Sequence, residues 1–407
     1  MSWFEYRNQV LCAESVSLAH IAKEVGTPLY CYSTAALKAN YEEFVDAFRD
    51  RDVLIAYSVK ANANQAVIAT LSACGAGADV VSGGELQRAL AAGVPGSRIV
   101  FSGVGKTFEE LNYAINKKIF LINAESKSEI IEIEKIAKSK KRIIDIGIRL
   151  NPNTDAKTIN QISTGKKEDK FGLTEKTFIE LVKYAKNSKY VNLKCLSVHI
   201  GSQIVNNLPY EKMLKVIDRV IKKSNHKFEF VDLGGGIGIA YHNKTKKLNY
   251  KKYSISISKF LKNHNSKIIF EPGRSIIGDT GILISKIIYI KKTKSKDFII
   301  LDSAMNDLMR PALYGSNHKI IPVIKKGGSS KKTYEFVGPI CESTDKFLTS
   351  KNFQKLKEKD LIIICDVGAY GMSLSSNYNV RPNPIEILIK GSKINIIKKR
   401  QKLIDLI

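Results

Sequence analysis

Four chemically different features each lie at the end of a short apolar, β-branched run of the sequence: a lysine, a histidine, a glycine-rich loop and a carboxylate. They are Lys60, His199, Gly234–Gly238 and Glu271. An amine at the end of an apolar strand can attack a carbonyl group, and the N–H groups of a glycine-rich loop can surround a phosphate. We therefore treat the four features as candidates for one active site.

Each of these features also has an ordinary structural explanation. A lysine at a strand end is usually a solvated cap, a histidine is more often a hydrogen-bonded core residue, and Glu271 before Pro272-Gly273-Arg274 could be part of a turn. The glycine run fails the dinucleotide spacing GxGxxG, because Ile239 and Tyr241 stand where its last glycine is required. Its glycines therefore favour an anion-binding nest around a single phosphate.

One cofactor, pyridoxal phosphate, requires all four features together. It needs a lysine amine to bond its aldehyde, N–H donors for its phosphate, a partner for its ring nitrogen and a group against its ring face. A carboxylate at Glu271 would keep the pyridine nitrogen protonated, which gives the strongest electron sink. A buried lysine is the better nucleophile, and we expect Lys60, at the end of an apolar strand, to be one.

The elements that must position these groups form a regular alternation between about residues 50 and 275. Eight strand-like runs alternate with amphipathic helical segments, which favours an α/β fold with a (β/α)8 barrel over an open doubly wound sheet, the competing interpretation. Parallel strands in a barrel place their carboxyl ends, and hence these side chains, at one face. The predicted strands are Val53–Tyr57, Ala78–Ser82, Arg98–Ser102, Ile119–Asn123, Ile143–Leu150, Leu193–His199, Phe228–Leu233 and Lys267–Glu271.

The sequence changes character after about residue 276. Strand-like runs separated by Gly-, Pro- and Lys-rich turns predict a second, mostly β C-terminal domain. Leu29–Tyr32 is a further strand candidate that could pair into this domain, since chain termini often lie close together. We therefore predict a barrel domain at 30–275 and a β-rich domain formed by 276–407 with 1–29. Its C-terminal strand candidates are Ile282–Ile290, Phe298–Asp302, Ile320–Ile324, Thr333–Val337, Leu361–Cys365 and Glu386–Ile389.

Short motifs lie along nearly the whole chain. They are Tyr57–Asn62, Ser82–Leu86, Ser163–Gly165, Lys170–Gly172, His199–Gln203, Leu233–Gly236, Glu271–Arg274, Asn306–Tyr314, Gly338–Ser343 and Asp366–Gly371. Together they resemble the family of diaminopimelate decarboxylases, pyridoxal-phosphate enzymes with an alanine-racemase-type barrel. The resemblance implies removal of the carboxylate at the D-configured centre of meso-2,6-diaminopimelate, giving L-lysine and CO2 in the final step of lysine biosynthesis.

The resemblance also implies roles for individual residues. Lys60 would bond the cofactor, His199 would stack on its ring, and Asp79 would lie near it. The groups that would hold the phosphate and the ring nitrogen are Ser202, Gly235, Gly236, Glu271, Gly273, Arg274 and Tyr370.

The substrate would be bound, by the same resemblance, at its far end. The groups for the distal carboxylate and ammonium would be Arg274, Arg310, Tyr314, Tyr370 and Glu342. Cys341 would protonate the carbon from which CO2 leaves. In this family Cys341 and Glu342 reach into the neighbouring subunit's site, which implies a homodimer with shared active sites. No metal is expected.

Other activities on the same fold are the nearest alternatives. Decarboxylases of ornithine, arginine or carboxynorspermidine lack a distal carboxylate to bind, whereas Arg310 beside Tyr314 supplies a cation for one. An ornithine site would typically carry Cys-Asp in place of Cys341-Glu342. Alanine racemase requires a tyrosine base in the second domain, and a non-catalytic cofactor-binding protein of this barrel has no second domain.

Three segments depart from the family pattern. They are Ala156–Ile162, Leu301–Ala304 and the Thr344-Asp345 step. We expect these departures to affect loop geometry and not the chemistry.

The net charge of +26 raises the separate hypothesis of a polyanion-binding protein. The lysines are dispersed over loops and helix faces, and no nucleic-acid reading motif accompanies them. We therefore expect a solvated lysine-rich surface with no specific nucleic-acid partner, whose binding to DNA is weak and is lost at moderate salt.

The lengths of the apolar runs and the spacing of the cysteines indicate the cellular compartment of the protein. No apolar run approaches the ~18 residues of a membrane span, and the N-terminus lacks a signal-peptide pattern. The six cysteines form no CxxC pair. We expect a cytoplasmic protein without a membrane association, a zinc ribbon or a disulfide framework.

Overall fold

The computed structural model describes residues 3–156, 164–165, 168–241 and 247–407, which fold as two compact units. The barrel unit contains the described residues of 41–240 and 245–275, and the β unit those of 1–40, 241–244 and 276–407. Of the segments that depart from the family pattern, Ala156–Ile162 lies outside the described residues apart from Ala156.

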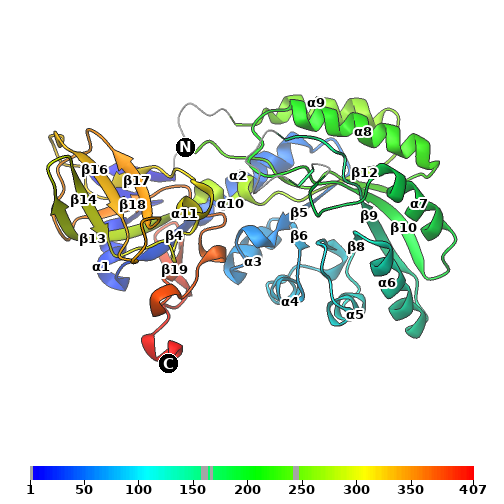
Figure 1. Cartoon of the computed structure of the whole chain (residues 1–407), viewed down its shortest axis with the longest axis horizontal. Helices are drawn as coiled ribbons and strands as arrows, with labels where there is room; N and C mark the ends of the chain where they lie inside the picture. The colour runs from blue at the N-terminus through cyan, green and yellow to red at the C-terminus, as the bar shows by residue number, and fades with distance from the viewer. Residues whose placement is uncertain (1–2, 157–163, 166–167, 242–246) are drawn as a thin grey trace. The chain divides into compact units, whose positions relative to one another are not determined.

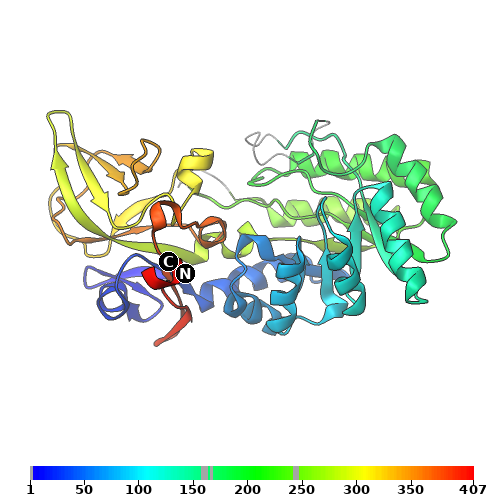
Figure 2. The ribbon, with the colours of Figure 1, turned by 60° about the horizontal axis from the view of Figure 1, so that its bottom comes forward.

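The barrel unit is built on a closed barrel of eight parallel strands (Figures 1 and 2). Consecutive strands are neighbours, and β12 pairs with β5 in the register Ile268 to Val53, which closes the barrel. The predicted (β/α)8 barrel is confirmed, and the open sheet is wrong. The strands are β5 (Val53–Ser58), β6 (Gly77–Val80), β7 (Ile99–Phe101), β8 (Leu121–Ala124), β9 (Ile144–Arg149), β10 (Val191–Ser197), β11 (Phe230–Asp232) and β12 (Lys267–Phe270).

Helices follow the strands, and several begin at a side-chain cap. Ser82 accepts a hydrogen bond from the backbone of Glu85 at the start of α4, and Thr107 and Glu110 form a reciprocal capping box at α5. These caps fix the strand-to-helix turns at the carboxyl ends of the strands. The helices that follow the strands β5 to β11 are α3 (Gln65–Ala73), α4 (Gly83–Ala91), α5 (Phe108–Asn116), α6 (Lys127–Ser139), α7 (Glu175–Lys186), α8 (Leu208–Ser224) and α9 (Tyr250–Leu261). Helix α2 (Thr34–Ala47) precedes β5, and its residues 34–40 belong to the β unit.

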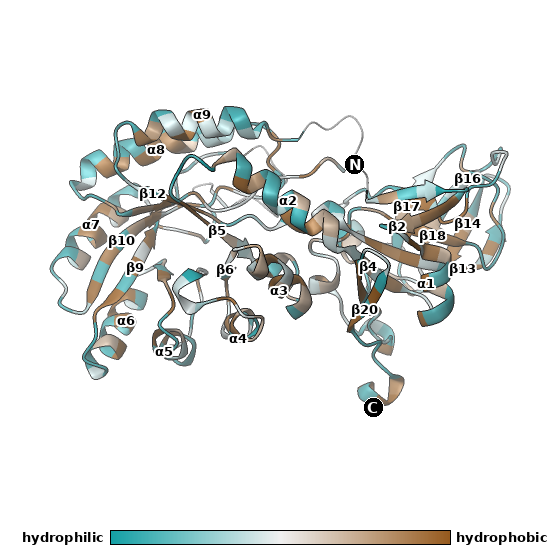
Figure 3. Ribbon diagram, turned by 180° about the vertical axis from the view of Figure 1, so that it is seen from behind, coloured by the Kyte–Doolittle hydropathy of each residue, from teal (hydrophilic) through white to brown (hydrophobic). Residues whose placement is uncertain are grey.

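Part of the barrel core is an apolar cluster. Six strands each contribute one buried member to a common cluster: Ala56, Val100, Leu121, Cys195, Phe230 and Ile269. Figure 3 shows the hydrophobic barrel strands, whereas α8 and α9 carry both hydrophobic and hydrophilic residues. Burial of the apolar helix faces against the strands gives the unit a second apolar layer, because each helix can bury only one stripe.

The β unit contains two sheets and a short helix, α1 (Leu18–Val25). A three-stranded antiparallel sheet comprises β1 (Phe4–Arg7), β2 (Val10–Ala13) and β3 (Val16–Ser17). In the larger sheet, the N-terminal strand β4 (Leu29–Ser33) lies between β13 and β19. The other members are β13 (Gly281–Lys292), β14 (Lys296–Leu301), β15 (Ile320–Pro322), β16 (Thr333–Val337), β17 (Lys346–Ser350), β18 (Leu361–Ile364), β19 (Ile385–Lys390) and β20 (Lys393–Lys398).

Two strands of this sheet have no counterpart among the predicted ones. β17 and β20 stand at its two ends, and most of their side chains are not buried. A strand that buries few side chains has no strict apolar alternation, so pattern reading does not detect it. Two short helices complete the unit: α10 (Arg274–Ile277), which enters it from the barrel unit, and α11 (Arg310–Tyr314).

Neither a membrane-spanning helix nor a metal-binding cluster is found in the described part of the chain. No helix within those residues is long and apolar enough to cross a bilayer. In the same residues, no three His, Cys, Asp or Glu side chains gather in a way that could hold a metal ion. All six cysteines are free thiols.

Candidate active site

The predicted site residues of the barrel unit lie at the carboxyl ends of its strands. Lys60 is in the 3-10 turn η1 (Val59–Ala61) that follows β5, and Asp79 is on β6. His199 follows β10, the glycine run follows β11, and Glu271 follows β12. Because the strands are parallel and form one barrel, these groups from distant parts of the sequence share one face.

Lys60 lies close to a buried carboxylate. Its Nζ is 3.7 Å from Oδ2 of Asp79, which also accepts a hydrogen bond from Oγ of Ser58 at 2.7 Å. The side chain of Lys60 is 39% exposed, whereas that of Asp79 is fully buried. The expectation of a buried Lys60 is thus wrong, because the residue stands in the turn beyond the strand. The exposed fraction makes the amine accessible to a ligand, and the carboxyl group of Asp79 lies beside it.

A second buried carboxyl group, that of Asp232, is at the end of β11. Asp232 accepts hydrogen bonds from Oγ of Ser197 and Nδ2 of Asn123, each at 2.9 Å, and from the backbone of Gly234 at 2.9 Å. It is also hydrogen-bonded to Glu271. Burial raises the pKa of Asp232 to about 6. Burial and the nearby Asp232 raise that of Glu271 well above its ordinary value. Two carboxyl groups in this arrangement retain a proton between them.

The Asp232–Glu271 pair predicts a pH dependence of stability. Both pKa values are higher in the folded chain, so the pair stabilises the fold below the unfolded value of 3.8 for Asp232, and this contribution is lost as the pH rises through about 6. Glu271→Gln removes the repulsion between the two carboxyl groups. In the absence of ligands, the stability of the variant relative to the wild type should therefore increase as the pH rises from 5 to 8. Urea unfolding at both values measures this.

A matched control for that experiment is Glu109→Gln. Glu109 is exposed and its pKa is lowered, mainly by a backbone hydrogen bond, so it is ionised at both pH values. Its effect on the free energy of unfolding should therefore not change between them. A Glu271→Gln effect that is equally constant would show that the pair does not share a proton.

The glycine run approaches neighbouring backbone too closely for other residues. A Cβ atom on Gly235 would lie 2.1 Å from the carbonyl oxygen of Glu271, and one on Gly236 would lie 2.1 Å from that of Gly201. Gly236 also has a φ of +86°, which L-residues rarely adopt. The run therefore packs backbone against backbone, as a loop that must surround a small anion does.

His199 is attached to this glycine run. Its Nδ1 accepts a hydrogen bond from the backbone N–H of Gly235 at 3.2 Å, which places any single ring proton on Nε2. The pKa of His199 is lowered well below its ordinary value by desolvation and by the positive charges of Lys60 and Arg149. The ring is therefore a neutral, flat surface beside the loop.

Ser202 and Arg274, two residues predicted to hold the cofactor, contact each other. Nη2 of the buried Arg274 donates to Oγ of Ser202 at 3.1 Å. A Cβ on Gly273 would lie 2.9 Å from that of Ala61, so the absence of a side chain at Gly273 lets the turn after β12 approach the turn that carries Lys60.

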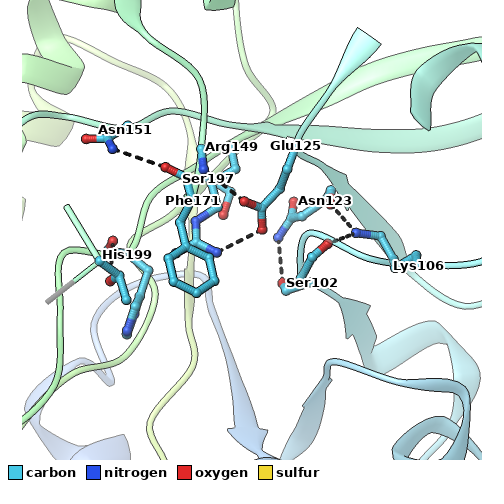
Figure 4. Close-up of polar contacts among 12 residues, drawn as sticks. Ser102, Lys106, Asn123, Glu125, Arg149, Asn151, Phe171, Ser197 and His199 are labelled. Carbon is cyan, nitrogen blue, oxygen red and sulfur yellow. Dashed lines mark hydrogen bonds and ion pairs between the residues drawn. The ribbon is translucent and has the colours of Figure 1, made fainter. Parts of the chain in front are cut away.

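A network that the sequence reading missed lies at the ends of β8 and β9 (Figure 4). Glu125 accepts a hydrogen bond from Nη1 of Arg149 at 2.9 Å and one from the backbone of Gly172 at 2.8 Å. The Arg149 guanidinium lies 4.9 Å from the ring centre of Phe171, and Asn151 donates to the Phe171 carbonyl at 3.1 Å. The network ties the Lys170–Gly172 motif to the strand ends.

The remaining predicted residues lie on three segments of the β unit. Arg310 begins α11 and is buried, and Tyr314 ends that helix. Cys341 and Glu342 are exposed between β16 and β17, where Glu342 accepts hydrogen bonds from Tyr378 and Thr344. The third segment carries Tyr370, which follows β18 with a φ of +57°.

The fold and the strand-end groups agree with a comparison to known families. A family described as "Pyridoxal-dependent decarboxylase, pyridoxal binding domain" matches residues 34–278, which include all eight barrel strands. The chain therefore belongs to the pyridoxal-dependent decarboxylase family.

Within that family the similarity is to diaminopimelate decarboxylases, as the motifs predicted. The diaminopimelate decarboxylase of Zymomonas mobilis is 41% identical over 414 residues, which cover 99% of this chain and 97% of the relative. That of Helicobacter pylori, solved in complex with L-lysine, superposes with a TM-score of 0.91 at 39% identity, covering 95% of this chain and 98% of the other. The diaminopimelate decarboxylase of M. jannaschii, also solved in complex with L-lysine, superposes with a TM-score of 0.92 at 34% identity. The match covers 99% of this chain and 96% of the other. The predicted family is confirmed.

Proposed function

We propose that the chain catalyses the decarboxylation of meso-2,6-diaminopimelate to L-lysine and CO2, the final step of lysine biosynthesis, with pyridoxal 5'-phosphate as cofactor. The observation that carries this proposal is the full-length similarity to diaminopimelate decarboxylases, combined with a lysine, a glycine-rich turn and a proton-retaining carboxylate at one face of the barrel.

The barrel residues fit this cofactor. The absence of a side chain at Gly236 lets the loop backbone pass close to Gly201, where a Cβ atom would collide, and backbone N–H groups of such a loop can bind a phosphate. Ser202 and Arg274 add a hydroxyl group and a cation for the same phosphate. The raised pKa of the buried Glu271 favours its protonated form, which could give a proton to a pyridine nitrogen. When bound, the cofactor supplies an electron sink for the negative charge that remains as CO2 leaves.

The chain's own groups then have separate tasks. Lys60 would hold the cofactor through its Nζ, beside the carboxylate of Asp79. His199 presents its neutral ring to the cofactor face, held by Gly235. Tyr370 binds the phosphate in addition to the barrel groups.

Residues of the β unit and Arg274 select the substrate in this proposal. Arg274, Arg310, Tyr314 and Tyr370 bind the carboxylate at the distal, L-configured end, where guanidinium groups match a carboxylate through paired N–H donors. Glu342 binds the distal ammonium group. Cys341 delivers the proton to the carbon from which CO2 has left.

The cofactor assignment is tested by reconstitution. Addition of pyridoxal phosphate to the purified chain should produce an absorption band near the visible edge, which borohydride removes by reducing the bond to the protein. Peptide mass mapping should then place the added mass on Lys60. The absence of a band, or a modification of other lysines only, would contradict the assignment.

The glycine run allows a matched test of phosphate binding. Gly236→Ala combines a positive φ with a collision, whereas Gly93 has the same φ of +86° and nothing within 4 Å of the added Cβ. Gly93→Ala should cost ~1 kcal/mol of stability and leave cofactor affinity unchanged. Gly236→Ala should weaken pyridoxal phosphate binding by roughly tenfold or more, or ~1.4 kcal/mol. Equal cofactor affinities in the two variants would contradict the role of the run.

We further propose a cytoplasmic homodimer in which Cys341 and Glu342 of each subunit complete the other subunit's site. No specific nucleic-acid partner is proposed.

Neither Lys60→Ala nor Cys341→Ala should be active alone. After the two variants are mixed and allowed to exchange subunits, each heterodimer contains one site with both residues intact, so activity should recover to roughly a quarter of the wild type. No recovery, despite subunit exchange shown by sedimentation or native mass spectrometry, would contradict shared sites.

A further inference from the structure

Several contacts within the β unit orient the guanidinium of Arg310. Its Nη1 is 2.9 Å from Nε2 of His318, its Nη2 donates to Oγ of Ser316 at 3.3 Å, and its guanidinium lies 4.8 Å from the ring centre of Tyr241. The side chain is only 5% exposed. A guanidinium recognises a carboxylate through a planar fork, so its orientation decides how well it binds.

The tautomer of His318 follows from the groups that its two ring nitrogens face. Its Nδ1 is 2.9 Å from the carbonyl oxygen of Cys365, and a carbonyl can only accept, so Nδ1 carries the hydrogen. Its Nε2 faces Arg310, and a guanidinium can only donate, so Nε2 presents a lone pair. His318 is therefore a neutral imidazole that accepts a hydrogen bond from Arg310.

The backbone around His318 is itself fixed by the sheet. His318 is 1% exposed and lies two residues before the start of β15, which pairs with β18. The backbone N–H of Cys365 donates to the carbonyl of Lys319 at 2.8 Å, next to the bond from His318 to the Cys365 carbonyl. The ring is thus attached to the sheet on one side and to Arg310 on the other.

We propose that His318 is a positioning residue for substrate binding, which sets the orientation of the Arg310 guanidinium toward the distal carboxylate. An uncharged acceptor suits this task, because a carboxylate in its place would neutralise the guanidinium and compete with the substrate. The inference rests on the proposed role of Arg310 and adds His318 to the groups that determine substrate choice.

Two substitutions separate positioning from a purely structural role. His318→Asn places an amide N–H near the position of Nδ1, so it retains a donor for Cys365 but is too short to reach Arg310. His318→Gln places an amide oxygen near the position of Nε2, so it retains an acceptor for Arg310 and loses the bond to Cys365. Positioning predicts that the asparagine variant is impaired and the glutamine variant is close to the wild type, whereas a structural role predicts the reverse.

The experiment measures binding and turnover in the cofactor-loaded enzyme. L-lysine, which carries the distal carboxylate, is compared with cadaverine, which lacks it. His318→Asn should weaken L-lysine binding and raise KM for meso-diaminopimelate by roughly tenfold, as for a lost hydrogen bond to a charged group, with little change in kcat or in cadaverine binding. In an Arg310→Met background the same substitution should change L-lysine affinity less than about twofold, since its effect acts through Arg310.

The possible results are distinguishable. Weakened L-lysine binding in the glutamine but not the asparagine variant, or an asparagine effect that persists in the Arg310→Met background, would overturn the positioning role. Equal binding of L-lysine and cadaverine by the wild type would instead overturn the assignment of Arg310 itself, and the role of His318 with it. A difference confined to the asparagine variant and dependent on Arg310 is the result that we expect.

Discussion

Replacement of Lys60 by alanine should abolish decarboxylation while the fold remains intact. Loss of the amine that bonds the cofactor should lower kcat by on the order of 10⁴-fold or more, or ~5.5 kcal/mol of transition-state stabilisation. The effect on folding should be small, because the side chain is 39% exposed and contributes little packing. Steady-state CO2 release and thermal unfolding measure the two quantities.

Lys60→Arg is the control for charge in this experiment. It keeps a cation beside the buried Asp79 but cannot form the same bond to an aldehyde, so it should be as inactive as the alanine variant. Both variants should also lose the borohydride-sensitive absorption band. Retention of more than a small fraction of activity in either variant would remove Lys60 from its assigned role.

Replacement of Arg310 by methionine should change substrate choice. A desolvated carboxylate that loses its guanidinium partner costs several kcal/mol, because a buried charge is left unsatisfied. The variant should therefore have a kcat/KM for meso-diaminopimelate lower by on the order of 10²–10⁴-fold. As substrates, lysine and ornithine must place their single carboxylate at the reacting position, which leaves none for Arg310 at the distal end. The wild type should therefore decarboxylate them barely, and the substitution should reduce the difference in kcat/KM between them and meso-diaminopimelate.

The comparison of the three amino acids gives this prediction its control. A loss that results only from damage to the fold would affect all three equally, and unfolding of the variant would reveal it. Equal losses, or rapid decarboxylation of ornithine by the wild type, would show that the distal pocket is misassigned. The protein would then belong functionally with the ornithine decarboxylases.

The fold, and the candidate site residues at the ends of the barrel strands, could be predicted from local sequence patterns. β-branched runs alternating with amphipathic helices define the barrel, and the barrel geometry then brings together whatever follows each strand. This reasoning identified Lys60, His199 and Glu271. The same rule applied to β8 and β9 would have indicated Glu125 and Arg149 as well.

The remaining features depend on contacts between distant residues, which no local pattern reveals. The raised pKa values of Asp232 and Glu271 depend on which strand ends meet, and the hydrogen bond from the backbone of Gly172 to Glu125 joins positions 47 residues apart. The exposure of Lys60 depends on a turn one residue beyond its strand. Similarly, the role that we propose for His318 rests on its hydrogen bonds with Arg310 and Cys365 and not on its sequence neighbours.

Product analysis of the wild-type enzyme tests the proposed reaction most directly. The purified chain, loaded with pyridoxal phosphate, is incubated separately with meso-2,6-diaminopimelate, ornithine and lysine, and the products are identified by NMR and chiral chromatography. We expect meso-2,6-diaminopimelate to yield one L-lysine for each CO2 released, with little or no putrescine from ornithine or cadaverine from lysine. Unchanged meso-2,6-diaminopimelate alongside steady formation of putrescine or cadaverine would contradict the assignment.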